Sequence, residues 1–324
     1  TYTASASPVV HKGAKLVIID SAPETFEMDY DKVAEAINEN TKAVIPVDLG
    51  GMICDYDRIF EIVESKKDLF KPANKLQAAI GRVAVISDGA HAFGSVKNGV
   101  KAGAIADFTS FSFHAVKNLT TAEGGALAWR NIDGVDNDEL YHELQLYSLH
   151  GQSKDALSKN KAGAWEYDVV YPAYKCNMTN INAAIGIAQL ERYEGLLARR
   201  KVLNERYEAA LEKLGIKVMH HYTDEMTSTG HLYLVRIPGA SVDDRNAVIQ
   251  EMAEREIACN VHYKPLPMMT AYKNLGFDIV DYPNAYHQYE NLISLPIFST
   301  MTDEQNEYVI ENFVDILKKR GLIK

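Results

Sequence analysis

Short apolar runs alternate with amphipathic segments along the first half of the chain. Each run is long enough for a buried strand, and each amphipathic segment spaces its apolar side chains three and four positions apart, as an α-helix requires. This alternation is typical of βα units and predicts an α/β fold with a mainly parallel sheet flanked by helices. The predicted strands are 16–20, 43–47, 83–87, 108–111 and 125–129, and the predicted helices are 29–38 and 55–66.

Helical patterns dominate the second half. They predict helices at 138–149, at 243–256 and at 302–319, a strand at 232–237, and one long helix over 180–214 that leads into a second domain. We therefore expect a large domain at 1–195 and a smaller C-terminal α+β domain at 196–324. Because an apparent interior strand follows within fifteen residues of Thr1, which is not an initiator Met, we expect the large domain to be N-terminally incomplete.

Composition and charge narrow the possible partners. The 324 residues include 34 basic and 44 acidic side chains, for a net charge of −10, which argues against a general nucleic-acid binder. No apolar run approaches the roughly 18 residues of a membrane-spanning helix, so we expect no membrane partner. Three scattered cysteines indicate neither a disulfide framework nor a metal site, and they favour a reducing cytoplasm.

Several common cofactor motifs are absent from the sequence. No Gly-x-Gly occurs, so the dinucleotide-binding fingerprint is missing, and no Gly-Lys pair occurs, so there is no phosphate-binding loop of the Walker type. The ten histidines show no spacing typical of metal ligands. We therefore expect no metal in the site.

Asp88 stands where an open α/β sheet binds its ligands. It follows the predicted strand 83–87 directly, and ligands of such sheets lie beyond the carboxyl ends of the strands. Burying a carboxylate there is costly unless another group pairs with it. Taken alone, Asp88 could equally cap a turn or a helix.

Lys117 follows the predicted strand 108–111 in a segment of small and apolar residues that ends in a glycine pair. Burial disfavours the charged form of a lysine and makes its amine nucleophilic near neutral pH. Taken alone, Lys117 could simply extend from a loop into water. A strand-end Asp followed about thirty residues later by such a Lys is, however, the pair that pyridoxal 5′-phosphate (PLP) requires: an amine for the cofactor aldehyde and a carboxylate for the ring nitrogen.

These segments resemble a known family. Ser-Asp-Gly-Ala-His-Ala-Phe-Gly from Ser87, Ser-Phe-His-Ala-Val-Lys-Asn from Ser112, and the following Glu-Gly-Gly are similar to motifs of the DegT/DnrJ/EryC1/StrS family. The resemblance continues through the segments that begin at Tyr174, His231 and His262, so it covers essentially the whole chain. It implies a fold-type I PLP-dependent transferase, and within the family the chain most resembles EpsN-like and bacillosamine-type sugar aminotransferases.

The resemblance also implies roles for individual residues. Lys117 matches the Schiff-base lysine, and Asp88 matches the partner of the pyridinium nitrogen. His91 matches the residue near the phenolic oxygen of the ring, and Ser112 matches a contact to the cofactor phosphate. Asn177 matches an asparagine that reaches the phosphate from the neighbouring subunit, which implies a homodimer with sites at its interface.

His114 and His262 fall on motif positions near the family's active site, where they would contact substrate; a packed structural role is the alternative for each.

The resemblance implies transfer of an amino group from L-glutamate to a nucleotide-linked keto-sugar, of the 4-keto-6-deoxy type, for cell-surface polysaccharide or glycan biosynthesis. The alternatives are a PLP-dependent amino-acid transaminase or lyase, and a non-catalytic PLP-binding regulatory protein.

Overall fold

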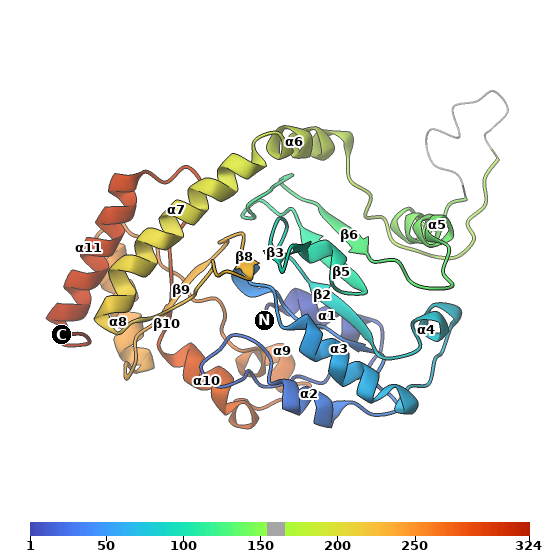
Figure 1. Ribbon diagram of the computed structural model, residues 1–324, viewed down its shortest axis with the longest axis horizontal. Coiled ribbons are helices and arrows are strands. Elements are labelled where there is room, and N and C mark those ends of the chain that lie inside the picture. Colours follow the sequence, from blue (N-terminus) through green and yellow to red (C-terminus); the bar gives the residue numbers. More distant parts are fainter. Residues whose placement is uncertain (154–165) are drawn as a thin grey trace.

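A computed structural model gives the fold of residues 1–153 and 166–324. Figure 1 shows a four-stranded sheet on one side of the molecule and an antiparallel sheet, with long helices beside it, on the other. The helices are α1 (Thr3–His11), α2 (Tyr30–Ala36), α3 (Tyr56–Ser65), α4 (Lys75–Ile80), α5 (Asn137–Ser148), α6 (Asn180–Leu190), α7 (Tyr193–Leu211), α8 (Val242–Glu254), α9 (Thr270–Lys273), α10 (Pro283–Glu290) and α11 (Asp303–Lys319). The strands are β1 (Ala43–Val44), β2 (Ala84–Asp88), β3 (Val96–Lys97), β4 (Val100–Lys101), β5 (Phe108–Ser112), β6 (Gly125–Trp129), β7 (Lys217–Val218), β8 (Met226–Thr227), β9 (Tyr233–Arg236) and β10 (Leu292–Leu295).

The four-stranded sheet has the order β1-β2-β5-β6. Strands β1, β2 and β5 run parallel, and β6 is antiparallel to β5. In the register of β2 and β5, Asp88 lies opposite Ser110, so both strands end at the same edge. This is the mainly parallel α/β sheet that the alternating pattern predicts.

Helix α3 shows how the sequence positions that sheet. The Asp55 side chain caps the helix by accepting a hydrogen bond from the backbone N–H of Arg58 at 3.1 Å. Ile59, Ile62 and Val63 then lie on one face, spaced three and four residues apart, and are buried in the core around β2. The predicted helix 55–66 is confirmed.

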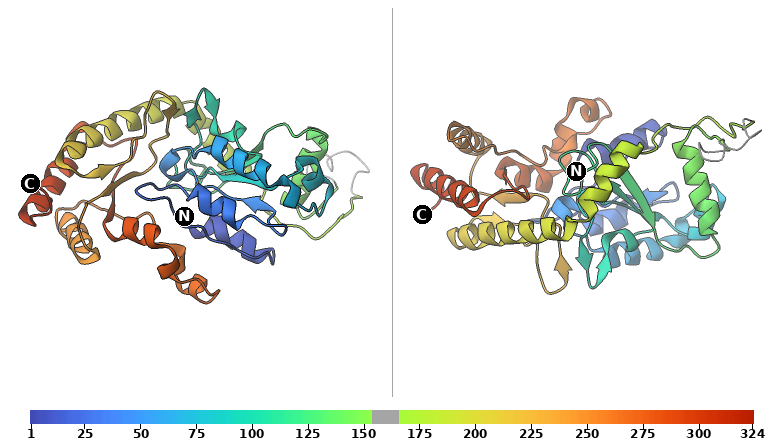
Figure 2. Two further views of the ribbon diagram at one scale, coloured as in Figure 1. Left: turned by 60° about the horizontal axis from the view of Figure 1, so that its bottom comes forward. Right: turned by 90° about the horizontal axis from the view of Figure 1, so that it is seen from above.

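The C-terminal part of the chain has its own core. Strands β10, β9 and β7 form an antiparallel sheet, and α11 packs against α7 and α8 beside it. Figure 2 shows these helices grouped around that sheet in two further views. The predicted strand at 232–237 and the helices at 243–256 and 302–319 are present with small changes at their ends. The domain boundary at 195 falls inside α7 and stays a prediction.

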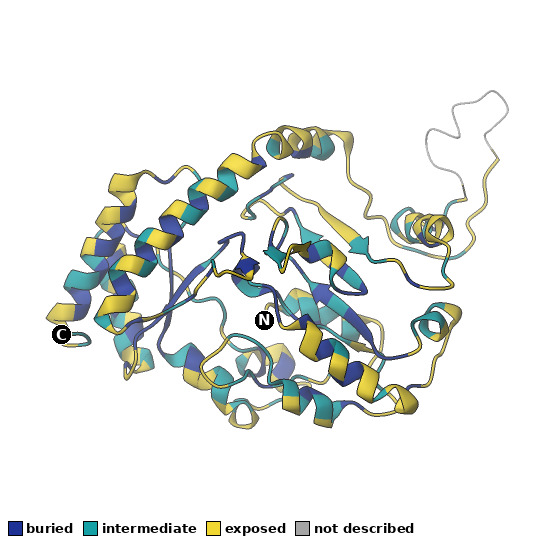
Figure 3. Cartoon of the chain, viewed as in Figure 1, coloured by how far each residue is buried: buried dark blue, intermediate teal, exposed yellow. Residues whose placement is uncertain are grey.

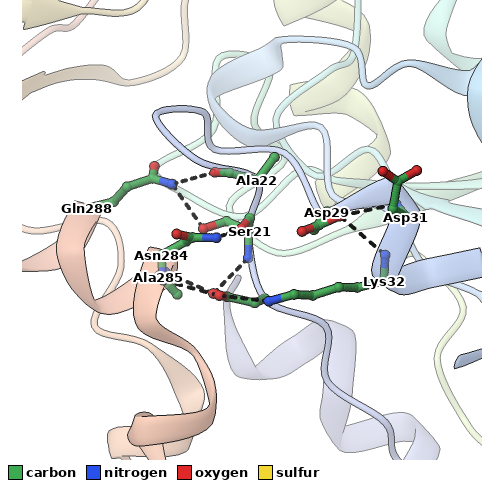
Figure 4. A network of polar contacts seen from close by, with 9 residues as sticks. Ser21, Ala22, Asp29, Asp31, Lys32, Asn284, Ala285 and Gln288 are labelled. Atoms are coloured by element: carbon green, nitrogen blue, oxygen red, sulfur yellow. Dashed lines mark hydrogen bonds and ion pairs between the residues drawn. The ribbon is translucent and has the colours of Figure 1, made fainter. Parts of the chain in front are cut away.

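The predicted strand at 16–20 is wrong: this segment joins none of the sheets. The Asp20 carboxylate instead accepts hydrogen bonds from the backbone N–H groups of Asn284 at 3.1 Å and Ala285 at 2.9 Å, in the first turn of α10. Lys32 of α2 pairs with the same carboxylate at 3.3 Å (Figure 4). The apolar run therefore ends on a helix N-terminus. Its Leu16 and Ile18 side chains pack against Ala6, Leu266 and Tyr272 rather than beside a strand.

The predicted long helix over 180–214 is also wrong, because two helices occupy this region. Arg192 separates α6 from α7 and has non-helical backbone angles, with φ −115° and ψ 3°. The Tyr193 hydroxyl donates a hydrogen bond to the Phe93 carbonyl oxygen at 2.5 Å, so α7 begins where the chain is held against the segment after β2. Among the described residues, no helix is both long and apolar enough to cross a bilayer.

Candidate active site

Asp88 is the last residue of β2, and its side chain is partly buried. Its carboxylate accepts hydrogen bonds from the Ser5 hydroxyl at 2.5 Å and from the Ala90 backbone N–H at 3.1 Å. Its backbone oxygen accepts from the N–H of Asp48 at 3.0 Å. A carboxylate oriented in this way at the carboxyl edge of a parallel sheet occupies the position where ligands of such folds bind.

Lys117 lies in a closed loop between β5 and β6. The loop is held by hydrogen bonds from the N–H of Phe113 to the oxygen of Gly124 at 2.8 Å, and from the N–H of Thr121 to the oxygen of Phe113 at 2.9 Å. Burial lowers the pKa of Lys117, and the charge of Asp88 opposes part of that shift. The structure therefore places these two groups near each other and increases the fraction of Lys117 that is a free amine.

His91 is buried beside the same two residues. Its Nδ1 accepts a hydrogen bond from the Gly50 backbone N–H at 3.1 Å, and its Nε2 lies 3.5 Å from the Tyr263 hydroxyl. Burial first, and then the positive charges of Lys117 and His262, lower the pKa of His91 to about 3. The imidazole is consequently neutral near pH 7 and is available as a hydrogen-bond partner.

His262 belongs to this cluster as well. Its Nδ1 lies 2.8 Å from the Ser294 hydroxyl, and the backbone N–H of His262 donates to the same oxygen at 3.2 Å. Burial, followed by the charge of Lys117, lowers its pKa. Four of the residues singled out in the sequence therefore share one region: Asp88, His91, Lys117 and His262.

The other three predicted residues lie differently. Ser112 is the last residue of β5, and its hydroxyl accepts from the His114 backbone N–H at 3.3 Å. The exposed His114 side chain faces Glu123, with its Nε2 3.5 Å from a carboxylate oxygen. Asn177 is exposed before α6 and bonds to Lys175, so the contacts of His114 and Asn177 are outside the cluster.

Sequence reasoning assigned no role to two residues of the cluster. His231 is buried, its ring centroid lies 4.4 Å from that of His91, and its Nδ1 lies 2.7 Å from the Asn118 side-chain oxygen. The Tyr263 ring lies against that of Tyr2, with the ring centroids 5.6 Å apart and the planes tilted by 40°. His231 and Tyr263 fall inside the segments that begin at His231 and His262, but no local pattern distinguishes the two residues from core residues.

A separate group of possible metal ligands lies in and beside α7. Atoms of Glu208, Glu212 and His220 approach within 4.8 Å of one another. His220 Nδ1 is 3.0 Å from Glu208 and its Nε2 is 3.6 Å from Glu212, so the imidazole lies between the two carboxylates. Such pairing accounts for the group without a metal ion.

The residues around Lys117 fit a PLP site by their chemistry. A lysine with a lowered pKa supplies the amine that an aldehyde cofactor needs, and Asp88 supplies a carboxylate for a protonated ring nitrogen. Neutral His91 supplies an uncharged hydrogen-bonding group beside them. Asp88 ends β2, His91 follows it, and Lys117 lies in the loop after the neighbouring strand β5, which explains how the fold brings the three side chains together.

Comparisons with known proteins agree with this chemistry. Spr1654 from Streptococcus pneumoniae, assigned as a sugar aminotransferase, is 53% identical in its PMP-form structure, with a TM-score of 0.96 over 98% of this chain and 80% of that one. Its PLP form gives a TM-score of 0.94. The spore coat polysaccharide biosynthesis protein SpsC of Bacillus subtilis is 33% identical over 98% of this chain and 77% of its own length.

More distant structures support the fold alone. PseC from Helicobacter pylori is 23% identical, with a TM-score of 0.83 over 98% of this chain. The fold-type I architecture expected from the motifs is confirmed by these neighbours. Residues 1–314 match the sequence profile of the DegT/DnrJ/EryC1/StrS aminotransferase family. The chain therefore belongs to the DegT/DnrJ/EryC1/StrS aminotransferase family.

Proposed function

We propose that this protein transfers an amino group from L-glutamate to a nucleotide-linked keto-sugar of the 4-keto-6-deoxy type, in cell-surface polysaccharide or glycan biosynthesis. The observation that carries the proposal is the half-buried Lys117, with its lowered pKa, beside Asp88 at the carboxyl edge of the sheet. The sugar aminotransferase assignment of Spr1654 and the polysaccharide role of SpsC support the substrate class.

The cofactor is pyridoxal 5′-phosphate, as in the family to which the chain belongs. When bound, it supplies an electron sink and carries the amino group between donor and acceptor. Lys117 would provide the amine that attaches to it, and Asp88 would accept a charge-assisted hydrogen bond from its ring N–H. His91 would hydrogen-bond the phenolic oxygen, and Ser112 would hold the phosphate.

Lys117 has a second task, as the base that removes a proton from the amino donor and returns it. Burial lowers its pKa, so a larger fraction of the side chain is unprotonated near neutral pH than for an exposed lysine. The charge of Asp88 limits this shift, which keeps the amine able to accept a proton. His262, in the same cluster, and His114, exposed in the loop that carries Lys117, contact the substrate.

The active unit is a homodimer. Figure 3 shows α6 largely exposed, and Asn182 at its start donates hydrogen bonds to the oxygens of Thr121 and Glu123 in the Lys117 loop, at 2.6 and 3.0 Å. A second copy seated on α6 would therefore lie beside the cluster, with Asn177 close to its partner's phosphate site. Exposed apolar side chains favour this surface: Tyr174, Met178, Ile181, Ile185, Ile187 and Leu190.

The protein acts in the cytoplasm, on small-molecule substrates and without nucleic acid or membrane. Its cysteines, Cys54, Cys176 and Cys259, are all unpaired, as expected in a reducing compartment. The acidic net charge of −10 is unfavourable for phosphate backbones, but local basic side chains are enough for a nucleotide diphosphate.

Mass spectrometry of products tests the function directly. The protein with PLP is incubated with glutamate and a panel of nucleotide-linked 4-keto-6-deoxy sugars, and in parallel with 2-oxo acids. An aminated sugar is the expected product. Amination of 2-oxo acids alone would indicate an amino-acid transaminase, and PLP binding without any product would indicate a regulatory protein.

Lys117→Ala tests the site. We expect loss of product and of the visible absorption band of the protein-bound cofactor. Lys101→Ala, at an exposed lysine on β4, is the matched control and should change neither. An unchanged spectrum in Lys117→Ala would refute the assignment of Lys117.

A further inference from the structure

Two buried imidazoles, those of His91 and His231, lie against each other near Lys117. The ring centroids of His91 and His231 are 4.4 Å apart and their planes are tilted by 44°. The charge of Lys117 contributes to a lowered pKa at both, after the larger effect of burial. Both rings are therefore neutral near pH 7, and each carries one N–H and one bare nitrogen.

A backbone donor fixes the protonated nitrogen of His91. The Gly50 N–H points at Nδ1 from 3.1 Å, so Nδ1 must be the acceptor and Nε2 must hold the proton. The donor cannot easily turn away, because Gly50 and Gly51 have φ values of 68° and 92° in a tight turn. A Cβ on Gly51 would meet the Thr229 hydroxyl at 2.0 Å, which shows how closely this turn is packed.

In His231 the proton is on the other ring nitrogen, Nδ1, and the side-chain amide of Asn118 holds it there. The Asn118 side-chain nitrogen donates to the Thr229 carbonyl oxygen at 2.9 Å, which directs its side-chain oxygen toward His231 Nδ1 at 2.7 Å. The reversed amide would set two oxygens against each other at Thr229. His231 Nδ1 therefore holds the proton, and its Nε2 is a bare acceptor. Within the described part of the chain, no hydrogen bond to that Nε2 is formed.

We infer that Asn118 is a positioning residue that holds His231 in the Nδ1–H tautomer, so that the Lys117 site contains a donor, His91 Nε2–H, and an acceptor, His231 Nε2. The inference rests on the proposed function only in taking this cluster as the active site. His91 then suits an anionic oxygen, such as a phenolate of the cofactor. His231 suits a group that donates a proton, such as a substrate hydroxyl or an ammonium.

The two tautomers can be read directly. Long-range ¹H–¹⁵N spectra of protein labelled at histidine nitrogen, with and without PLP, distinguish protonated from bare ring nitrogens. The signals of the two residues are assigned by their loss in His91→Gln and in His231→Gln. We expect a protonated Nε2 in His91 and a protonated Nδ1 in His231. The same tautomer in both rings, or rapid exchange in His231, would overturn the inference.

Variants of Asn118 test its positioning role. Asn118→Ala should convert the single His231 tautomer into an exchanging mixture and leave His91 unchanged. Asn118→Asp keeps an acceptor oxygen at Nδ1, so it should restore the single tautomer, and exposed Asn40→Ala is the control. A single Nδ1–H tautomer that persists in Asn118→Ala would refute the role of Asn118.

The spectra separate this inference from the proposed function. Opposite tautomers in a protein that aminates no sugar would leave the inference standing and refute the proposed function. A protein that aminates sugars but holds the same tautomer in both rings would support the proposed function and refute the inference. If Asn118→Ala does not fold, the wild-type spectra and Asn118→Asp still decide the outcome.

Discussion

A buried ion pair joins the starts of the two strands that carry the site. Arg82 precedes β2 and Asp107 precedes β5, and their side chains are only 5% and 2% exposed. Arg82 Nη1 lies 2.7 Å from Asp107 Oδ2 and Nη2 lies 2.9 Å from Oδ1, a bidentate pair. The Asp107 carboxylate also accepts from the Val85 N–H at 2.8 Å and pairs with Arg130 at 2.8 Å.

The change Asp107→Asn removes the charge and leaves the buried Arg82 without its main partner. Breaking a buried pair in this way costs about 3–5 kcal/mol of unfolding free energy. Arg82 keeps its contacts to the half-exposed Glu64 carboxylate at 2.9 Å and to the Val83 carbonyl oxygen at 3.0 Å, so we expect a loss near the low end, about 3 kcal/mol. The double variant Arg82→Met/Asp107→Leu removes both charges and should recover most of that loss.

Urea unfolding at one fixed protein concentration measures these differences, because the stability of the proposed dimer would depend on concentration. Arg58→Ala is the control: its pair with Asp31 is exposed and should leave the midpoint unchanged. A loss below about 1 kcal/mol in Asp107→Asn would refute the reasoning. A double variant that is no more stable than Asp107→Asn would also refute it.

Three further predictions concern a helix cap, pH and the dimer. Thr302→Ala removes the side-chain acceptor of the α11 capping box and should cost about 1 kcal/mol in urea unfolding. Because the pKa of His91 is lowered to about 3, the unfolded chain binds a proton there below about pH 6.5 that the folded protein does not. The unfolding free energy should therefore fall as pH decreases from about 6.5 toward 3, and less steeply in His91→Gln. Ile181→Glu, at a side chain 77% exposed on α6, should yield monomers in light scattering, whereas Val280→Glu, 74% exposed near α10, should not.

The sequence predicts the parts of the fold that local patterns determine. Strand β2 is an apolar run that ends in Asp88, and β5 is followed by a small-residue loop with Lys117, so their chemistry could be placed at one sheet edge. The run at 16–20 has the same apolar character. The conformation of this run depends on the hydrogen bond that the Asp20 carboxylate accepts from the Asn284 N–H, 264 positions away. No local pattern contains that information.

The same limit applies to the site. Asp88 and Lys117 could be identified because each follows its own strand, and parallel strands end together. His231 could not, because its role depends on Asn118, 113 positions earlier, and on a ring contact with His91. A motif match identifies such a residue, but it does not show which groups hydrogen-bond to the ring or which ring nitrogen faces the site.

The electrostatics of the cluster follow from this arrangement. His91, His231 and His262 all have pKa values that burial lowers, so near pH 7 they add hydrogen-bonding groups around Lys117 without adding positive charge. The charge of Asp88 then acts on Lys117, whose pKa it raises against the effect of burial. A protonated histidine in the cluster would compete for that carboxylate and lower the pKa of the amine further. Burial of the three rings thus keeps histidine positive charge away from the lysine–carboxylate pair.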